Sequence, residues 1–342
     1  MSKRPTIKDL AEAAGVSSAT VDRVLNSRSS VRRATVERVL LAADQIGYHA
    51  AGLLRLRADE ALPRRRVCFL MQRTVDPFYQ RLGKALTDAC QYSANIKLDP
   101  ELIYMDEVSP SYIAAKLREA AEFDAIALVT LDHSLITREI ESLYQQGVPV
   151  LCLLSDISTE QYSGFIGWDS HKVGRTAAWT IHHLCHKPGK VGILLGSHRY
   201  LGQQRAETSF INYFREQGES FTLLPSVLNL DDDRLAAESV SELLSQHPDL
   251  VGIYSAGGGS RGMIETLRQE ASEHNIICVC NELTDHSRLA LRDGIIHLAI
   301  GTPIERVAGQ AVKRLQSALA ARELPPPVEI HLPAELYISE NI

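Results

Sequence analysis

The chain has 342 residues, 45% of them hydrophobic and 23% charged, which is ordinary for a globular protein with room for two or three domains. No apolar run approaches the roughly 20 residues that a bilayer-spanning helix needs, and the charged start of the chain lacks the apolar core of a signal peptide. We therefore expect a cytoplasmic protein. The six cysteines contain no CxxC pair, which indicates reduced thiols rather than a disulfide framework or a metal site.

The net charge of −6 argues against nucleic acid as a partner, but the charge is unevenly distributed. Residues 1–66 carry 13 Lys and Arg against 7 Asp and Glu, a net of +6. The rest of the chain carries 23 basic against 35 acidic residues, a net of −12. A basic head on an acidic body predicts that the head alone meets a polyanion.

Apolar spacing in the first fifty residues predicts three short helices, over about 7–14, 18–25 and 33–46. Thr6 is the expected N-cap of the first helix and Ser17 that of the second, with Gly15 breaking the chain between them. Two short helices around a glycine turn, backed by a third, are typical of a helix-turn-helix, although a generic three-helix cap has the same pattern.

The identities of these residues are more informative than their apolar spacing. The blocks Thr6-Ile7-Lys8-Asp9-Leu10-Ala11-Glu12-Ala13-Ala14-Gly15-Val16-Ser17, Ala19-Thr20-Val21, Arg23-Val24-Leu25-Asn26 and Gly47-Tyr48 resemble, in order and spacing, the DNA-binding head of the lac repressor (LacI/GalR) family. The resemblance implies that Ser18, Ala19 and Arg23 face base edges in the major groove, the only groove that distinguishes all four base pairs. The residues that it places at operator DNA are Thr6, Ser17, Ser18, Ala19, Thr20, Asp22, Arg23, Asn26, Arg32, Arg33, Tyr48 and, in the connector, Leu56.

Two positions depart from the family pattern. Asp22 stands where the family usually has Ser, and a carboxylate is repelled by phosphates unless it accepts from a cytosine amino group or pairs with Arg23. We therefore expect an unusual operator preference at the base pair that this residue faces. Arg32 stands where a Ser usually caps the third helix, which puts that cap in doubt.

The connector, residues 51–66, is basic and leucine-rich. In the family this stretch becomes a hinge helix when two subunits sit on DNA, and a leucine from it wedges into the minor groove. Leu53, Leu54 and Leu56 are the candidates, and we favour Leu56; a plain basic linker is the alternative. Because one recognition helix reads only a few base pairs, we expect a homodimer on a pseudo-palindromic operator.

From residue 67 short apolar runs alternate with helical stretches, which predicts buried parallel strands with helices on both faces. The segment 165–178 resembles the crossover between the lobes of periplasmic sugar-binding proteins and of LacI-family cores. The expected fold is thus an all-α helix-turn-helix head (1–50), a hinge (51–66) and a two-lobed periplasmic-binding-protein-like α/β core (67–342). We expect lobe one over about 67–162 and 298–322, and lobe two over about 163–297 and 323–342.

Ligands of such lobes bind beyond the carboxyl ends of the strands, in the cleft between the lobes. Carboxylates, amides and guanidinium groups suit the hydroxyls of a sugar, sugar acid or polyol, and an aromatic ring suits its C–H face. Any single residue of this kind also fits a helix cap or a solvated loop. The polar and aromatic residues that follow strands are Asp76, Phe78, Tyr79, Asp156, Trp168, Asp169, Arg199, Arg205, Gly257, Asn281 and Glu282.

A glycine motif offers a competing hypothesis. Residues 257–262 satisfy GxGxxG, follow a strand and open a helix, and Glu282 lies twenty residues after Gly262. This pattern is that of a dinucleotide site, so an NAD(P)-binding oxidoreductase or redox-sensing regulator is an alternative. The same glycines also suit close approach to a sugar, or a simple tight turn. The sequence favours a DNA-binding regulator, without catalysis, metal or cofactor, over this alternative and over a solute-binding protein with no role on DNA.

Overall fold

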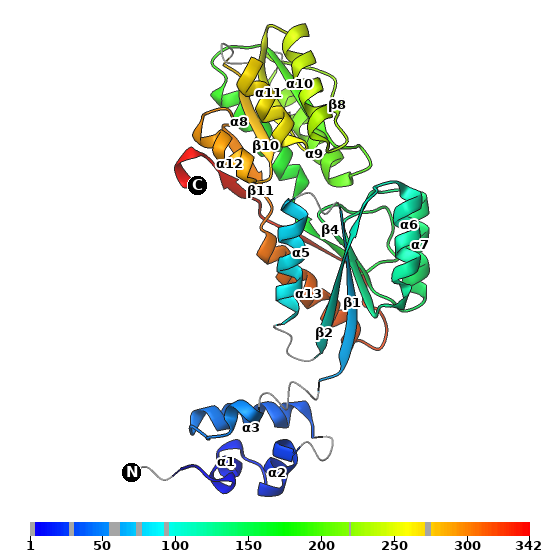
Figure 1. Cartoon of the computed structure of the whole chain (residues 1–342), viewed down its shortest axis with the longest axis vertical. Coiled ribbons are helices and arrows are strands. Elements are labelled where there is room, and N and C mark those ends of the chain that lie inside the picture. Colours follow the sequence, from blue (N-terminus) through cyan, green and yellow to red (C-terminus); the bar gives the residue numbers. More distant parts are fainter. Residues whose placement is uncertain are drawn as a thin grey trace. The chain divides into compact units, whose positions relative to one another are not determined.

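The structure, a computed structural model, describes residues 4–26, 31–54, 62–72, 77–91, 96–218, 220–270 and 275–342. The chain divides into two compact units, Met1–Arg65 with Ser93–Leu98, and Arg66–Tyr92 with Asp99–Ile342. The first is the head and the second the core (Figure 1). Within the described ranges, no helix combines the length and apolar character needed to cross a bilayer.

The head contains the three expected helices, α1 (Ile7–Ala14), α2 (Ser18–Asn26) and α3 (Arg33–Gln45). A capping box opens α1, in which the Thr6 amide donates to Asp9 at 2.7 Å and the Asp9 amide donates to the Thr6 hydroxyl. Gly15 ends that helix in the left-handed conformation, at φ 62°, which only glycine adopts without strain. The side chains that pack between the helices include Leu10, Val21, Val39, Ala43, Tyr48 and Leu54.

The core contains two sheets, each covered by helices (Figure 1). The first has the order β12-β5-β4-β3-β1-β2, with strands β1 (Arg64–Gln72), β2 (Lys97–Met105), β3 (Ala125–Leu128), β4 (Val150–Leu153), β5 (Gly164–Trp168) and β12 (Val328–Leu332). The second has the order β13-β11-β10-β9-β6-β7, with β8 also paired to β6. Its strands are β6 (Lys190–Leu195), β7 (Thr222–Leu223), β8 (Val227–Leu228), β9 (Leu250–Ser255), β10 (Ile277–Asn281), β11 (Leu298–Gly301) and β13 (Glu335–Tyr337).

Lobe one, built on the first sheet, carries α5, α6, α7 and α13, and lobe two carries α8 to α12. The helices are α5 (Pro77–Cys90), α6 (Pro110–Glu119), α7 (Ser134–Gln145), α8 (Ser170–Leu184), α9 (Leu201–Gln217), α10 (Asp233–Gln246), α11 (Ser260–Glu270), α12 (Asp285–Arg292) and α13 (Ile304–Ala320). Two short 3-10 turns, η1 (Ala120–Glu122) and η2 (Ser339–Asn341), complete the described elements. The predicted apolar runs 67–71, 125–129, 148–154, 191–195, 250–254 and 276–280 correspond to strands β1, β3, β4, β6, β9 and β10, which all pair in parallel within the two sheets.

The division into lobes differs from the prediction. Strand β5 pairs with β4 in lobe one, and β12 pairs with β5, so 164–168 and 328–332 belong to lobe one. Strand β11 pairs with β10 in lobe two. The chain therefore crosses between the lobes after Trp168, after Gly301 and after Leu332. The prediction failed because a buried apolar strand carries no signal for the sheet in which it finds its partner.

Helices α8 and α9 pack against one another on lobe two at close range around Gly174. A Cβ atom added at Gly174 would lie 2.0 Å from the carbonyl oxygen of Ala206 and 2.2 Å from the hydroxyl of Ser209. The position therefore requires glycine because of interhelical contact, not because of its own backbone conformation.

We expect Gly174→Ala to lower the free energy of unfolding by about 1–3 kcal/mol, because the methyl group forces the two helices apart. The matched change Gly309→Ala meets no atom within 4 Å, and we expect it to raise stability by roughly 0.5–1 kcal/mol through the higher helix propensity of Ala. Urea denaturation of both variants checks this, and equal effects at the two positions would contradict it.

Candidate functional site

The exposed face of α2 carries the residues expected to read DNA. Ser18, Ala19, Asp22 and Arg23 are exposed, whereas Val21 on the opposite face is fully buried. The Ser17 hydroxyl accepts the amide hydrogen of Thr20 at 3.1 Å, as the sequence predicted for an N-cap. The helix thus presents one polar face, which has the size and shape to enter a major groove.

Asp22 has a partner that the sequence did not suggest. The Asn26 side-chain amide donates to Asp22 Oδ1 at 2.8 Å, while Arg23 Nε donates to the carbonyl of Ala19 at 3.2 Å. Arg23 is thus directed along the helix rather than toward Asp22. The second carboxylate oxygen of Asp22 lies on the exposed face, where it can accept from the amino group of cytosine or adenine.

The other predicted DNA-contacting residues and hinge leucines are exposed, buried in the core of the head, or outside the described residues. Arg32 is exposed and makes no side-chain cap to α3. Tyr48 is 7% exposed and packs in the core of the head. Leu54 is buried in the same core, whereas Leu53 is 51% exposed. Leu56 and the side chain of Arg33 lie outside the described residues.

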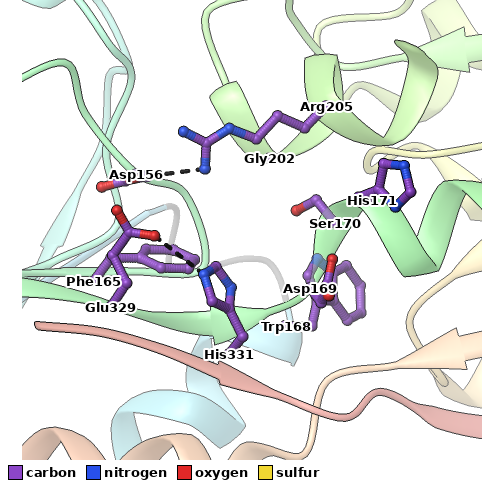
Figure 2. A pocket seen from close by; sticks show the side chains of 10 residues that line it. All are labelled: Asp156, Phe165, Trp168, Asp169, Ser170, His171, Gly202, Arg205, Glu329 and His331. Atoms are coloured by element: carbon purple, nitrogen blue, oxygen red, sulfur yellow. Dashed lines mark hydrogen bonds and ion pairs between the residues drawn. The ribbon is translucent and has the colours of Figure 1, made fainter. Parts of the chain in front are cut away.

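A cavity of about 270 Å³ lies between the two lobes of the core (Figure 2). Lobe one contributes the ends of β4, β5 and β12, and lobe two contributes the first turns of α8 and α9. The lining residues are Asp156, Phe165, Trp168, Asp169, Ser170, His171, Gly202, Arg205, Glu329 and His331. A ligand here would touch both lobes and the crossover that follows Trp168.

Asp156 is the most buried charged group of this cavity, with 4% of its surface exposed. Its carboxylate accepts from the amide of Ile157 and the hydroxyl of Tyr162, both at 2.9 Å, and lies 3.6 Å from Arg205 of lobe two. Burial, together with the negative charge of Asp156, raises the pKa of Tyr162 far above its ordinary value. The hydroxyl therefore stays protonated and serves as a donor that holds the carboxylate in place.

Strand β12 brings a carboxylate and an imidazole to the cavity. Glu329 and His331 are two residues apart and so project from the same face of β12, with 3.1 Å between the carboxylate and the imidazole Nε2. Phe165, which pairs with Glu329 in the strand register, lies with its ring 5.7 Å from that of His331. This wall of the cavity therefore combines an aromatic surface with an acceptor and an imidazole.

Asp169 forms the opposite wall, where it caps α8 by accepting from the amide of Lys172 at 3.1 Å. Burial alone would raise the pKa of Asp169, but hydrogen bonds and charge from Lys172 outweigh it and lower the pKa below its ordinary value. Asp169 is therefore held as a carboxylate beside the cavity.

Four of the predicted effector residues, Asp156, Trp168, Asp169 and Arg205, meet in this cavity. Phe78 and Tyr79 lie on α5 with their rings 5.1 Å apart, and Arg199 is exposed, with its carbonyl accepting from Asp132 of lobe one. Asp76 lies outside the described residues. The sequence reasoning missed Phe165, Ser170, His171, Gly202, Glu329 and His331, although the alternation of Glu329 and His331 on a strand was a usable signal.

Asn281 and Glu282 bind protein groups rather than this cavity. Asn281 donates to the carbonyl of Ala256 at 2.8 Å, and Glu282 accepts from the amide of Thr302 at 3.1 Å and from its hydroxyl at 2.5 Å. Glu282 also lines a second cavity, of about 610 Å³, together with residues of α5, α12 and α13. These two side chains hold the ends of neighbouring strands together.

The glycine motif forms a turn in which the amides of Gly258 and Gly262 are already bonded. The Gly258 amide donates to Asp231 Oδ1 at 2.6 Å, and the Gly262 amide donates to Asp233 Oδ1 at 3.3 Å. A Cβ at Gly257 would lie 2.6 Å from the same Asp231 oxygen. The glycines thus admit a carboxylate of the protein at the place where a dinucleotide would put its pyrophosphate, and the dinucleotide hypothesis finds no support.

Comparison with known proteins agrees with this division into a three-helix head and a two-lobed α/β core. Residues 67–323 match the family described as periplasmic binding protein domain, and residues 6–50 match the bacterial regulatory proteins of the lacI family. The chain belongs to the LacI/GalR family of regulators, which join these two domains.

Two curated relatives illustrate the likeness. The transcriptional regulator MalR of Streptomyces coelicolor is 27% identical over 257 residues, 74% of this chain and 66% of MalR, so the match spans slightly less than two thirds of that relative. The regulator GalR of Escherichia coli is 23% identical over 265 residues, 76% of this chain and 74% of GalR.

Solved structures share the fold of the core. The glucose-galactose binding protein GanP of Geobacillus stearothermophilus superimposes with a TM-score of 0.74 at 17% identity, over 82% of this chain and 99% of that protein. A solute-binding protein of Agrobacterium vitis, solved with α-D-tagatopyranose, gives a TM-score of 0.73 at 17% identity, over 81% of this chain and 95% of that one.

We expect Asp22 to select a base with an exposed amino group, cytosine or adenine, at one position of each half-site. Asp22→Ser should relax that preference by roughly 1 kcal/mol, because the acceptor for the amino group is lost. Selection from a random duplex library by the full-length chain and by the variant measures this. Glu12→Gln on α1 controls for net charge, and an unchanged preference in Asp22→Ser would sink the prediction.

Proposed function

We propose that this chain is a sequence-specific transcriptional regulator, a homodimeric repressor in the cytoplasm, and not an enzyme. A small sugar-like or polyol effector, bound in the cavity between the lobes, would change its affinity for operator DNA. The observation that carries the proposal is that one chain joins an exposed recognition helix to a cavity built from both lobes of a binding-protein core. The names of its relatives and structural neighbours, which include regulators and sugar-binding proteins, point the same way.

The cavity suits an effector that controls lobe orientation. It takes Asp156 from lobe one and Arg205 from lobe two, and it borders the crossover at Trp168. A ligand that bridges these groups binds best at one relative orientation of the lobes. By linkage, it shifts the lobes toward that orientation, and the DNA affinity shifts with them.

The lobes also contact one another directly. Tyr200, at the start of α9 in lobe two, is 7% exposed and packs into the hydrophobic core of lobe one. Its hydroxyl donates to Gln72 of lobe one at 2.8 Å, and Arg81 of α5 donates to the carbonyl of Leu283 at 2.9 Å. These contacts favour a defined closed arrangement, which is what a two-state sensor needs.

The first residue of the core fixes the point where the connector enters lobe one. The Arg66 guanidinium lies 4.4 Å from the centre of the Phe123 ring and pairs with Glu101 and Glu122 at 3.3 and 3.4 Å. Its amide donates to Asp124 at 2.7 Å. Arg66 is therefore held in place on lobe one.

The homodimer is supported by an apolar surface on lobe two. Leu289 of α12, Leu336 of β13 and Ile338 are 53%, 49% and 44% exposed, and they lie on elements that neighbour one another. Exposed large apolar residues on neighbouring elements are common at interfaces. A second copy of the chain is the occupant that a pseudo-palindromic operator requires.

We expect a neutral sugar or polyol to stabilise the full-length chain in a thermal-shift panel, by roughly 2.7 kcal/mol at 100 times its dissociation constant. Arg205→Ala should abolish the shift, because it removes the lobe-two partner of Asp156. Arg234→Ala, on the exposed side of α10, should leave the shift intact. The same ligand must then alter binding to selected operator DNA, and a ligand that stabilises the protein without changing operator affinity would refute the proposal.

We expect Leu289→Glu to weaken dimerisation at least tenfold, because it buries a charge in an apolar contact. Operator affinity should fall with it, since one head reads too few base pairs to bind tightly. Sedimentation equilibrium measures the dimer, with Leu184→Glu on the exposed face of α8 as the control. A full dimer population in the Leu289 variant would show that this surface is not the interface.

A further inference from the structure

On lobe two, the starts of α8 and α10 and the glycine turn before α11 are occupied by the protein's own carboxylates. Asp169 caps α8, and Asp232 caps α10 by accepting from the amides of Arg234 and Leu235, both at 3.0 Å. Asp231 and Asp233 bind the amides of the glycine turn that opens α11. Backbone amides at helix starts bind phosphate and carboxylate groups well, so these positions are closed to an anionic ligand by prior occupation.

The cavity itself has an excess of negative charge. Asp156, Asp169 and Glu329 supply three carboxylates against the single guanidinium of Arg205, a balance of −2 with His171 and His331 neutral. Protonation of both imidazoles would bring the balance only to zero. Counting Lys172, which lies 3.3 Å from Asp169 outside the lining, makes the balance −1 with neutral imidazoles.

Two groups in the lining favour anions, and neither reverses the balance. Among the described residues of the lining, Arg205 is the one permanent cation, and Asp156 lies 3.6 Å from it. The first turn of α9 reaches the cavity at Gly202 and has no side-chain cap. A helix start contributes about half a positive charge, which is less than the carboxylate excess with neutral imidazoles.

The geometry points to an effector without negative charge. We propose that this cavity binds an uncharged or amine-bearing sugar or polyol and excludes sugar acids and sugar phosphates. The inference rests on the proposed effector site and narrows its ligand. The carboxylates of the cavity accept hydrogen bonds from hydroxyl or ammonium groups, whereas a ligand carboxylate or phosphate would meet like charges in a partly buried space.

Matched ligands test the proposal directly on the full-length chain. Each set contains a neutral hexose, its 2-amino derivative, its uronic acid and its 6-phosphate, for D-glucose, D-galactose and D-mannose. Isothermal titration calorimetry gives a dissociation constant for each. We expect the neutral or amino member of a binding set to bind at least about tenfold more tightly than its acid and its phosphate.

Two variants separate charge from shape. Glu329→Gln and Asp169→Asn each remove one negative charge from the lining, and Asn still caps a helix. We expect each to narrow the ratio between neutral and acidic ligands by several-fold. Glu238→Gln on α10 makes the same change in net charge on an exposed ion pair and should leave the ratio unchanged.

The outcomes are distinct. An acid or phosphate that binds as tightly as its neutral parent overturns this inference and leaves the proposed sensor standing. A ratio that stays constant in both cavity variants overturns the electrostatic argument. Binding by no member of any set overturns the proposed sugar sensor together with this inference.

Discussion

The parallel pairing of β12 with β5 determines most of the architecture of the core. A strand from the last fifteen residues of the chain pairs with one from its middle, with Val328 beside Gly164 and Leu332 beside Trp168. The approach is so close that a Cβ at Gly164 would lie 2.1 Å from the carbonyl oxygen of Val328, and Gly164 has a φ of 123°. This pairing forces the third crossover between the lobes. It also carries Glu329 and His331 to the cavity, which they could not reach from the second sheet.

Local signals in the sequence determine the head almost completely. Thr6, Ser17 and Gly15 act within three or four residues of their own positions, so the caps and the turn could be predicted from a short window. The six apolar strands were equally clear, because a buried parallel strand needs a continuous apolar run. The division of the chain into lobes could not be predicted in the same way, since the pairing between β12 and β5 joins residues more than 160 positions apart.

The candidate site was only half predictable for the same reason. Polar residues directly after strands were visible, and four of them line the cavity. Asn281 and Glu282 looked equally suitable, but Ala256 and Thr302, which satisfy them, come from other strands. Asp231 is the clearest example of a residue whose role is invisible in sequence. It takes a left-handed conformation at φ 55°, next to Leu230 at φ 53°, in order to reach the glycine turn. Such conformations cost roughly 1–3 kcal/mol each in non-glycine residues, a cost that the surrounding contacts, this one among them, must offset.

Tyr200 is shared between the two lobes. The ring belongs to one lobe by sequence and to the hydrophobic core of the other by packing. Separating the lobes would therefore expose an aromatic surface to water. It would also remove the Tyr200 hydroxyl from Gln72, a buried side chain whose nitrogen already has no hydrogen-bond partner among the described residues. Closure of the lobes in this molecule therefore buries hydrophobic surface, as folding does. Contacts of Tyr200 thus favour one arrangement of the lobes before any ligand binds. A ligand shifts an equilibrium between lobe arrangements that these contacts already bias.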